Sequence, residues 1–557
     1  MAIFKRISPH GFILLLIVLP VLGSACSLLE WSQVPSPPPA PQDLPEIPVP
    51  SPTQEPTIAS TATPTPLIVW VSAAVPPALR TTFETFASAD QASIKLVDDE
   101  TLSQVQVEPF AEHILATWTY AFVAPFPTTQ DDISFETLQR AWDGGGDPFR
   151  PILVSPSTHG AMTSLLGESS DELINQVARE SLLEYSWAAR TVYAVVPFED
   201  LDPRWKVLSV DGISPIRVDF DPDAYPLTVP FGLSGNPSDV QRLKDLIPWP
   251  TTNRDPLHMT VLVMTGVTAL TRGTAYRMDL HGATYPGEKI GDWLREADWT
   301  HVSNEVSFSE SCPPPDPYTA ELRFCSAPSH LALLEHVGVD LVELTGNHVL
   351  DWGAEAFLFT LDLYTARDWK TFGGGADLKK ALLPAIVEHN GNRLAFLGCN
   401  AAGPQRAWAT DESPGATPCD EDQLFREVSR LRDEGYLVVF TYQWAEGAAL
   451  MPAQREAFRA VVDAGAVIVS GSQAHQPMGF EFYEAGLIHY GLGNLFFDQM
   501  QRLELRQEFI DRHVFYEGRH ISTELLTALL VDYSQPRPMT SDERLVFLQG
   551  MFSKSGW

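Results

Sequence analysis

The residues whose types and spacing could do chemistry are concentrated in segment 344–353, which reads LTGNHVLDWG. Asn347 and His348 follow an apolar run that alternates like a strand. At the C-terminal end of a strand in an α/β sheet, an Asn amide oxygen can ligate a metal and an imidazole can act on a reacting oxygen. Asp351 can orient the ring of His348 or cap the next helix. A plain hydrogen-bonded turn is the alternative for the whole segment.

Two further blocks accompany this segment at a distance. They read GAVIVSGSQAH at residues 465–475 and YGLGNLFFD at residues 490–498. In combination, the three blocks resemble the poly-γ-glutamate capsule biosynthesis (CapA) family, whose domain resembles calcineurin-type metallophosphoesterases. The resemblance covers roughly residues 257–500. It implies a layered α/β domain of metallophosphoesterase type that acts on or holds a polyanionic envelope or capsule polymer, or its phosphorylated precursor.

The resemblance also assigns roles to individual residues. It implies that Asn347 is a metal ligand and that His348 is a proton donor or a phosphate contact. Glu305 keeps the carboxylate of the family's Asn-Leu-Glu block, and a carboxylate can ligate a hard cation. Arg272 matches an arginine that follows the family's first strand, and it is the best available contact for an anion.

Several of the family's metal ligands are replaced in this chain. Val267 stands where the family has an Asp, and valine cannot ligate a metal. The family's His-Trp-Gly-x-Glu block loses its imidazole, because Gln443 or Tyr442 occupies the His position, depending on the alignment. The family's His-x-His block retains only its second imidazole, as Gln473 and His475.

The remaining donors predict a degenerate, single-metal site. Glu305, Asn347 and His475, with Gln473 or Gln443, can hold one oxygen-preferring ion such as Mg²⁺, Mn²⁺ or Ca²⁺. A two-metal clamp would need the missing Asp and His ligands. If the protein is an enzyme, it is therefore a one-metal hydrolase with His348 as the acid or base. The alternative is a non-catalytic envelope protein that binds a ligand or serves as a scaffold.

The N-terminus predicts export and anchoring. Residues 1–26 contain Lys5 and Arg6, a short apolar core and small residues before Cys26, which resembles a bacterial lipoprotein site. Ordinary signal cleavage or an uncleaved anchor is the alternative, because Gly23 replaces the usual aliphatic residue. Residues 27–66 form a tether, with 12 prolines between positions 35 and 66. We therefore expect an extracytoplasmic protein that is held to the membrane by a lipid on Cys26.

Charge and cysteine content narrow the partners and the compartment. The formal net charge of −34 disfavours nucleic acid and anionic lipid surfaces as partners, although solubility alone explains it equally well. The negative charge is compatible with divalent cations as ligands. Setting Cys26 aside leaves four cysteines in an exported chain, for which we expect the pairs Cys312–Cys325 and Cys399–Cys419.

The patterning predicts two α/β domains after the tether. Residues 67–245 begin with a strand at 67–71, include a helix at 170–183, and weakly resemble the substrate-binding proteins of transport systems. This domain would hold a small phosphorylated or anionic ligand. The resemblance implies that residues 257–557 form the metallophosphoesterase-like domain. The patterning predicts helices at 421–434 and 452–464 around a strand at 436–442, and a hairpin at an Asn-Gly turn.

Overall fold

The structure is a computed structural model that describes residues 65–145, 150–170, 172–447 and 449–557. The predicted signal segment with Cys26 and nearly all of the predicted tether lie outside these residues. Within the described part, residues from 65 onward belong to one compact unit, Thr63–Trp557. No helix in the described part is long and apolar enough to cross a membrane.

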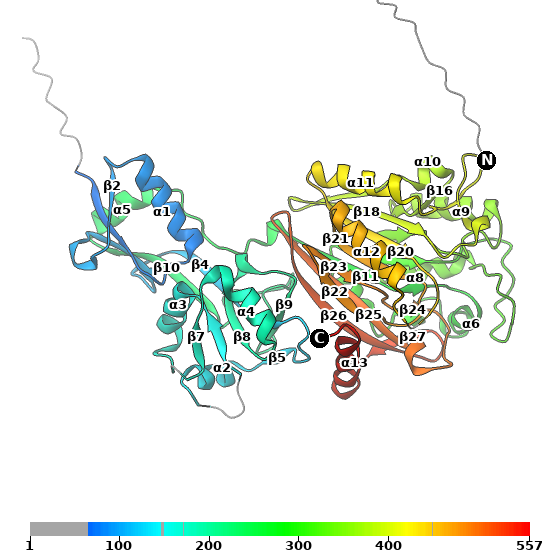
Figure 1. The fold of residues 1–557 in the computed structure, drawn as a ribbon, viewed down its shortest axis with the longest axis horizontal. Helices are drawn as coiled ribbons and strands as arrows, with labels where there is room; N and C mark the ends of the chain where they lie inside the picture. Colours follow the sequence, from blue (N-terminus) through cyan, green and yellow to red (C-terminus); the bar gives the residue numbers. More distant parts are fainter. Residues whose placement is uncertain (1–64, 146–149, 171, 448) are drawn as a thin grey trace, which may run out of the picture. The chain divides into compact units, whose positions relative to one another are not determined.

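The first α/β part is built on a ten-stranded mixed sheet (Figure 1). Its strand order is β2-β1-β3-β10-β4-β8-β6-β7, with β9 beside β4 and β5 beside β9. The strands are β1 Leu67–Val71, β2 Ile94–Val97, β3 Val105–Pro109, β4 His113–Pro125, β5 Asp132–Ile133, β6 Ile152–Val154, β7 Ile174–Gln176, β8 Tyr193–Pro197, β9 Trp205–Val210 and β10 Thr228–Gly235. The helices are α1 Pro77–Ala89, α2 Phe135–Trp142, α3 Pro156–Leu166, α4 Leu182–Ala189 and α5 Pro237–Leu246.

The prediction of a helix at 170–183 is wrong. Within that stretch the chain forms strand β7, because Ile174 pairs with Ile152 at the edge of the sheet. Helix α4 begins only at Leu182. A strand partner 22 residues away in the sequence decides this segment, and local periodicity does not reveal such a partner.

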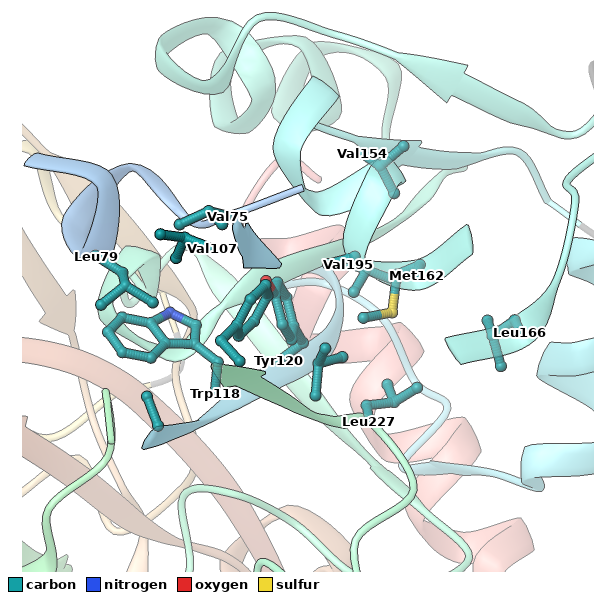
Figure 2. Packing of buried hydrophobic residues seen from close by; sticks show 14 of the residues in the cluster. Val75, Leu79, Val107, Trp118, Tyr120, Val154, Met162, Leu166, Val195 and Leu227 are labelled. Carbon is teal, nitrogen blue, oxygen red and sulfur yellow. The ribbon is translucent and has the colours of Figure 1, made fainter. Parts of the chain in front are cut away.

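Strand β4 runs through the centre of this sheet and supplies two large core residues. Trp118 and Tyr120 are 2% and 1% exposed and pack among Val75, Met162 and Val195 (Figure 2). The Trp118 indole Nε1 donates a hydrogen bond of 3.0 Å to a carboxylate oxygen of Glu199. The other carboxylate oxygen accepts a bond of 2.6 Å from the amide of Asn253. The central strand is thereby linked to a half-buried acid.

This acid makes the stability of the protein depend on pH. Burial raises the pKa of Glu199 from 4.5 to about 7, although the hydrogen bond from Asn253 opposes the shift. Between these two values the folded state keeps a proton that the unfolded state has lost, so the folded state loses its advantage as the pH rises through 7. We expect the wild type to lose about 1–3 kcal/mol relative to Glu199→Gln between pH 5 and pH 8.

Urea unfolding at several pH values measures this difference. The amide of Glu199→Gln does not titrate, so the stability of this variant should change little over the same range. Glu180→Gln, at an exposed position, is the control and should follow the wild type. Parallel pH profiles for wild type and Glu199→Gln would contradict the assignment.

The second α/β part contains two larger sheets, which face each other. The nine-stranded sheet has the order β15-β14-β13-β11-β25-β26-β27 with β12 and β24 beside it, and the six-stranded sheet has the order β17-β18-β20-β21-β23-β22. A short pair, β16 Gly374–Gly375 and β19 Gly415–Ala416, stands apart. The nine strands are β11 Met259–Thr265, β12 Val267–Thr268, β13 Trp299–Asn304, β14 Leu341–Glu343, β15 Lys370–Phe372, β24 Asn494–Phe496, β25 Gln507–Tyr516, β26 Arg519–Val531 and β27 Gln535–Pro538. The six are β17 Ala385–His389, β18 Asn392–Asn400, β20 Leu437–Gln443, β21 Ala466–Ser472, β22 Phe480–Tyr483 and β23 Gly486–His489.

Helices cover the outer faces of these two sheets (Figure 1). Those on the nine-stranded sheet are α6 Arg272–His281, α7 Gly291–Arg295, α8 Leu331–His336 and α9 Ala354–Thr365, whereas α11 Glu421–Asp433 and α12 Pro452–Ala464 cover the six-stranded sheet. The remaining helices are α10 Leu378–Ala381 and the C-terminal α13 Ser541–Lys554. An apolar core that contains Phe372, Phe396 and Phe509 fills the space between the sheets. This arrangement confirms the layered α/β fold.

Local sequence signals in this part agree with the structure. The predicted helices 421–434 and 452–464 form as α11 and α12, and the predicted strand 436–442 forms as β20. Asn390 and Gly391 connect β17 and β18 with φ values of 48° and 77°. Two consecutive positive φ values are what a two-residue hairpin turn requires, and Asn-Gly satisfies that requirement.

The two α/β parts share apolar cores. Phe126, at the end of β4, packs against Phe480 and Trp557, with ring centroids 5.7 and 5.8 Å apart. Asp131 accepts hydrogen bonds from Lys206 of the first part, at 2.6 Å, and from Arg544 of the second part, at 2.7 Å. The chain between β10 and β11 connects the sheet of the first part to those of the second, and apolar packing continues between the two parts.

Both predicted disulfides are confirmed, as Cys312–Cys325 and Cys399–Cys419. The first closes a loop of 13 residues' separation. In the chain-entropy model such a loop contributes about 3 kcal/mol by restricting the unfolded chain. We expect the double variant Cys312→Ser/Cys325→Ser to lose about that much free energy of unfolding in urea titrations. An unfolding midpoint equal to that of the wild type would contradict the expectation.

Candidate metal centre

The predicted site residues lie where parallel strands end. Strands β12, β13 and β14 run parallel to each other in the nine-stranded sheet, and β20 and β21 run parallel in the six-stranded sheet. Glu305 follows β13, and Asn347 and His348 follow β14. Gln443 ends β20 and Gln473 follows β21. The carboxyl ends of parallel strands meet at one edge, which brings these side chains together.

Two glycines allow the close approaches that this edge needs. A Cβ on Gly346 would lie 2.7 Å from the backbone Cα of Glu305, so only glycine lets the Asn-His turn approach the acid. A Cβ on Gly266 would lie 2.1 Å from the carbonyl oxygen of Gly493. Gly346 belongs to the segment 344–353 that carries the resemblance, and its place in the structure gives a physical reason for it.

Four of the predicted ligands converge on one point. The Gln443 amide nitrogen donates to Glu305 Oε1 at 2.7 Å and lies 3.4 Å from Asn347 Oδ1. The same nitrogen donates to the side-chain oxygen of Gln473. Gln443 is 0% exposed and Glu305 is 2% exposed, so water competes little with these contacts. One carboxylate and two amide oxygens thus surround the amide nitrogen of Gln443.

Buried groups behind Gln443 hold its amide oxygen. Ser472 Oγ donates to Gln443 Oε1 at 2.6 Å and lies 3.3 Å from Glu343 Oε1. Glu343 also accepts a hydrogen bond from the hydroxyl of Thr345, and it lies 3.3 Å from the ring of His301. The sequence analysis missed Ser472 and Glu343, because neither residue type marks a site without knowledge of its neighbours.

His348 is oriented by Asp351. His348 Nδ1 lies 2.6 Å from Asp351 Oδ2, and that same oxygen accepts the backbone N–H of Phe324 at 3.0 Å. The residue at the N-cap of α9 is Gly353, and no side chain caps this helix. Asp351 therefore orients the ring of His348, as the first of the two predictions has it, and does not cap the helix. Burial acts to lower the pKa of His348, but the bond to Asp351 and the charge of Glu305 outweigh it and raise the pKa above its ordinary value.

Arg272 is held beside the site by an acid and two aromatic rings. Its guanidinium pairs with Asp498 and lies 4.9 Å from the ring centroids of both Phe324 and Phe497. Phe324 also packs against the ring of His348, with centroids 4.6 Å apart. Asp498 ends the block at 490–498, and it is the anchor of Arg272 that the sequence analysis did not assign.

His475 lies one step further out than the other predicted ligands. Its Nδ1 lies 2.8 Å from Asn494 Oδ1, and its Nε2 is 4.0 Å from the exposed carboxylate of Glu446. Gln473 contacts the same carboxylate at 3.5 Å. His475 is therefore linked to the four converging residues through Glu446. Val267, the residue in place of the family's Asp, is buried in the short strand β12.

Three of the site residues have unusual backbone conformations. Arg272, Gln473 and His475 have φ values of 46°, 76° and 54°. A non-glycine residue whose backbone adopts this left-handed conformation costs about 1–2 kcal/mol of folding free energy. Surrounding packing and hydrogen bonds must therefore hold these residues in place, as is common where side chains are positioned for a site.

A groove of about 260 Å³ opens beside Arg272. The loop closed by the Cys312–Cys325 disulfide forms one wall. Arg272 and Arg323 line the groove together with Asp316 and Glu321, and Arg323 also lies 4.3 Å from the ring of Trp352. An anionic group in the groove would meet two guanidinium groups next to the His348–Phe324 pair.

The donor set fits one hard cation and does not fit a pair of metals. Glu305, Asn347 and Gln473 provide oxygens, which Mg²⁺, Mn²⁺ and Ca²⁺ prefer, and water would complete their shells. In the described part of the chain, no three His, Cys, Asp or Glu side chains are grouped to hold a metal. A zinc or iron pair would need such a group. The geometry therefore defines a cluster of oxygen donors at the ends of parallel strands, without the ligands that a metal pair would need.

The comparisons with known proteins show a similarity to capsule biosynthesis proteins. Residues 261–499 match the family model described as "Bacterial capsule synthesis protein PGA_cap". The "Capsule biosynthesis protein CapA" of Bacillus anthracis is 26% identical over 56% of this chain and 76% of its own length. The "PGA biosynthesis protein CapA" of Bacillus subtilis (strain 168) is 26% identical over 37% of this chain and 55% of its own length.

Among solved structures, the likenesses are weaker. A 5'-nucleotidase precursor from Thermus thermophilus is 14% identical, has a TM-score of 0.31, and covers 53% of this chain and 59% of its own. An ABC-type phosphate transport receptor from Vibrio cholerae is 13% identical, has a TM-score of 0.26, and covers 32% of this chain and 91% of its own.

Proposed function

We propose that this protein takes part in the biosynthesis of a capsule polymer of the poly-γ-glutamate type, as a CapA-like protein that acts on or holds a polyanionic envelope polymer. The family match and the names of the two CapA relatives support the coarse role. The convergence of Glu305, Asn347, Gln443 and Gln473 beside His348 is the observation that supports a chemical role. The activity proposed is hydrolysis or transfer at one metal.

The residues of the chain divide this work among them. One Mg²⁺, Mn²⁺ or Ca²⁺ would be held by the side-chain oxygens of Glu305, Asn347 and Gln473. The side-chain oxygen of Gln443 would join them once its amide turned over. Such an ion supplies charge stabilisation at a phosphoryl or carbonyl oxygen. His348, oriented by Asp351, holds a proton at Nε2 and can give it to a leaving oxygen. Arg272 and Arg323 bind anionic groups of the polymer in the groove beside His348.

Metal analysis and turnover together test this proposal. The soluble part, residues 67–557, should take up about one equivalent of Mn²⁺ or Ca²⁺ in calorimetry. It should also hydrolyse a phosphoester or a γ-glutamyl polymer in a reaction that a chelator stops. Absence of both cation binding and hydrolysis would defeat the enzymatic proposal and favour a binding or scaffold role.

Binding of a small ligand by residues 67–245 is the second candidate function. A pocket of about 450 Å³ is lined by Ser155, Thr158, Arg179 and Arg519, with Glu199 and Asp200 also at its wall. Arg179, which pairs with Asp200, and Arg519 are the cationic groups through which the pocket would contact a small phosphorylated or anionic ligand. A rise in melting temperature with phosphate or glutamate, lost in Arg179→Gln, would favour this role.

We also propose an extracytoplasmic location, with the protein anchored by a lipid on Cys26. The signal-like segment and the tether behind it support this proposal. Metabolic labelling with a fatty-acid analogue should be strong in the wild type and lost in Cys26→Ser. Equal labelling of the two proteins would refute the anchor.

A further inference from the structure

The amide nitrogen of Gln443 occupies the centre of an oxygen cage. Glu305 Oε1, Asn347 Oδ1 and the side-chain oxygen of Gln473 all face it. Resting on the single-cation site of the proposed function, we propose that this amide is a built-in substitute for the cation. Its nitrogen lies where the cation would bind, and a cation binds once the amide turns over and presents its oxygen.

The numbers of donors and acceptors support this substitution. A primary amide has two N–H donors, and here it faces three oxygens that can only accept. The partial positive charge on the N–H groups is what keeps these oxygens together without an ion. With the amide reversed, Gln443 Oε1 would join them, and four oxygens would repel each other unless a cation lay between them. A cation therefore favours the reversed orientation that the cation-free site disfavours.

Ser472 makes both orientations of the amide acceptable. Its hydroxyl now donates to Gln443 Oε1 at 2.6 Å. A hydroxyl both donates and accepts, so it can accept from the reversed amide and turn its own hydrogen to Glu343 Oε1, which is 3.3 Å away. Glu343 is 2% exposed and Gln443 is 0% exposed, so neither orientation relies on water. Ser472 and Glu343 are thus positioning residues for Gln443.

This substitution weakens cation binding in a defined way. The apparent affinity falls by the fraction of molecules whose amide is already reversed. It also selects for ions that prefer oxygen, because the reversed amide adds a fourth oxygen and no nitrogen ligand. Removing the N–H donors at position 443 should therefore tighten cation binding.

Calorimetry with Mn²⁺ on the soluble part tests the inference. Gln443→Glu replaces the donor group by an acceptor, and it should bind Mn²⁺ at least about tenfold more tightly than the wild type. Gln473→Glu is the matched control, since it adds the same charge to the same cage but keeps the Gln443 amide. It should gain less than Gln443→Glu. The melting temperature of Gln443→Glu should rise more on adding Mn²⁺ than that of the wild type.

Gln443→Asn keeps the test independent of added charge and of folding. Its amide is one methylene shorter and withdraws from the cage, which removes the competing N–H groups together with the fourth oxygen, so Mn²⁺ binding should tighten, but less than in Gln443→Glu. If neither Gln443→Glu nor Gln443→Asn binds more tightly than the wild type, the inference is overturned, even if the wild type binds Mn²⁺ and turns over substrate. If the wild type binds no cation and hydrolyses nothing while both variants bind Mn²⁺, the inference stands and the enzymatic proposal fails.

Discussion

Glu305→Gln should lower the affinity for Mn²⁺ or Ca²⁺ by more than about 100-fold, because even the hydrogen-bond partners of metal ligands contribute 10–100-fold. Glu305 carries the only carboxylate among the oxygens that face Gln443 in the described part of the site. Its charge acts in a buried place, where electrostatic attraction is stronger than in water. Gln keeps the shape of the side chain and removes that charge.

Calorimetry of both proteins with Mn²⁺ measures the loss. Glu310→Gln is a suitable control, because Glu310 is exposed five residues further along the chain. The control should bind the ion as the wild type does. An affinity of Glu305→Gln within a few-fold of the wild type would mean that the ion, if bound at all, lies elsewhere.

His348→Ala should reduce turnover by about 10²–10⁴-fold while leaving the metal content nearly unchanged. The imidazole is bound by Asp351 and packs on Phe324, and it makes no contact with the Gln443 amide that would tie it to cation binding. Turnover and cation binding should therefore separate in this variant. Added imidazole should restore part of the activity, because it can occupy the space of the missing ring.

Asp351→Asn distinguishes orientation from proton transfer. It leaves His348 in place but removes the charge that holds the ring, so turnover should fall less than in His348→Ala. His348→Ala that turns over substrate like the wild type would rule out the proposed role of the ring. A loss of Mn²⁺ binding in His348→Ala would assign the ring to the cation instead.

Much of the fold could be predicted from the sequence, because the signals are local. The Asn390-Gly391 turn has the two positive φ values that these residues tolerate. The apolar periodicity of α11 and α12 predicted both helices. The helix predicted at 170–183 does not form there, because Ile174 pairs with Ile152 of strand β6 and the segment becomes strand β7. Sequence separation hides such partners.

By itself, the sequence determined the kinds of residue at the candidate site and their places at strand ends: Asn347 and His348 after one strand, Glu305 after another, and glutamine in place of histidine at 443 and 473. Only the tertiary structure decided which way the Gln443 amide faces, that Asp351 holds His348 rather than capping a helix, and that Ser472 and Glu343 lie behind the cage. The physical reason is that a hydrogen bond depends on which donor faces which acceptor, and residues that bond each other here, such as Glu305 and Gln443, lie 138 residues apart in the chain.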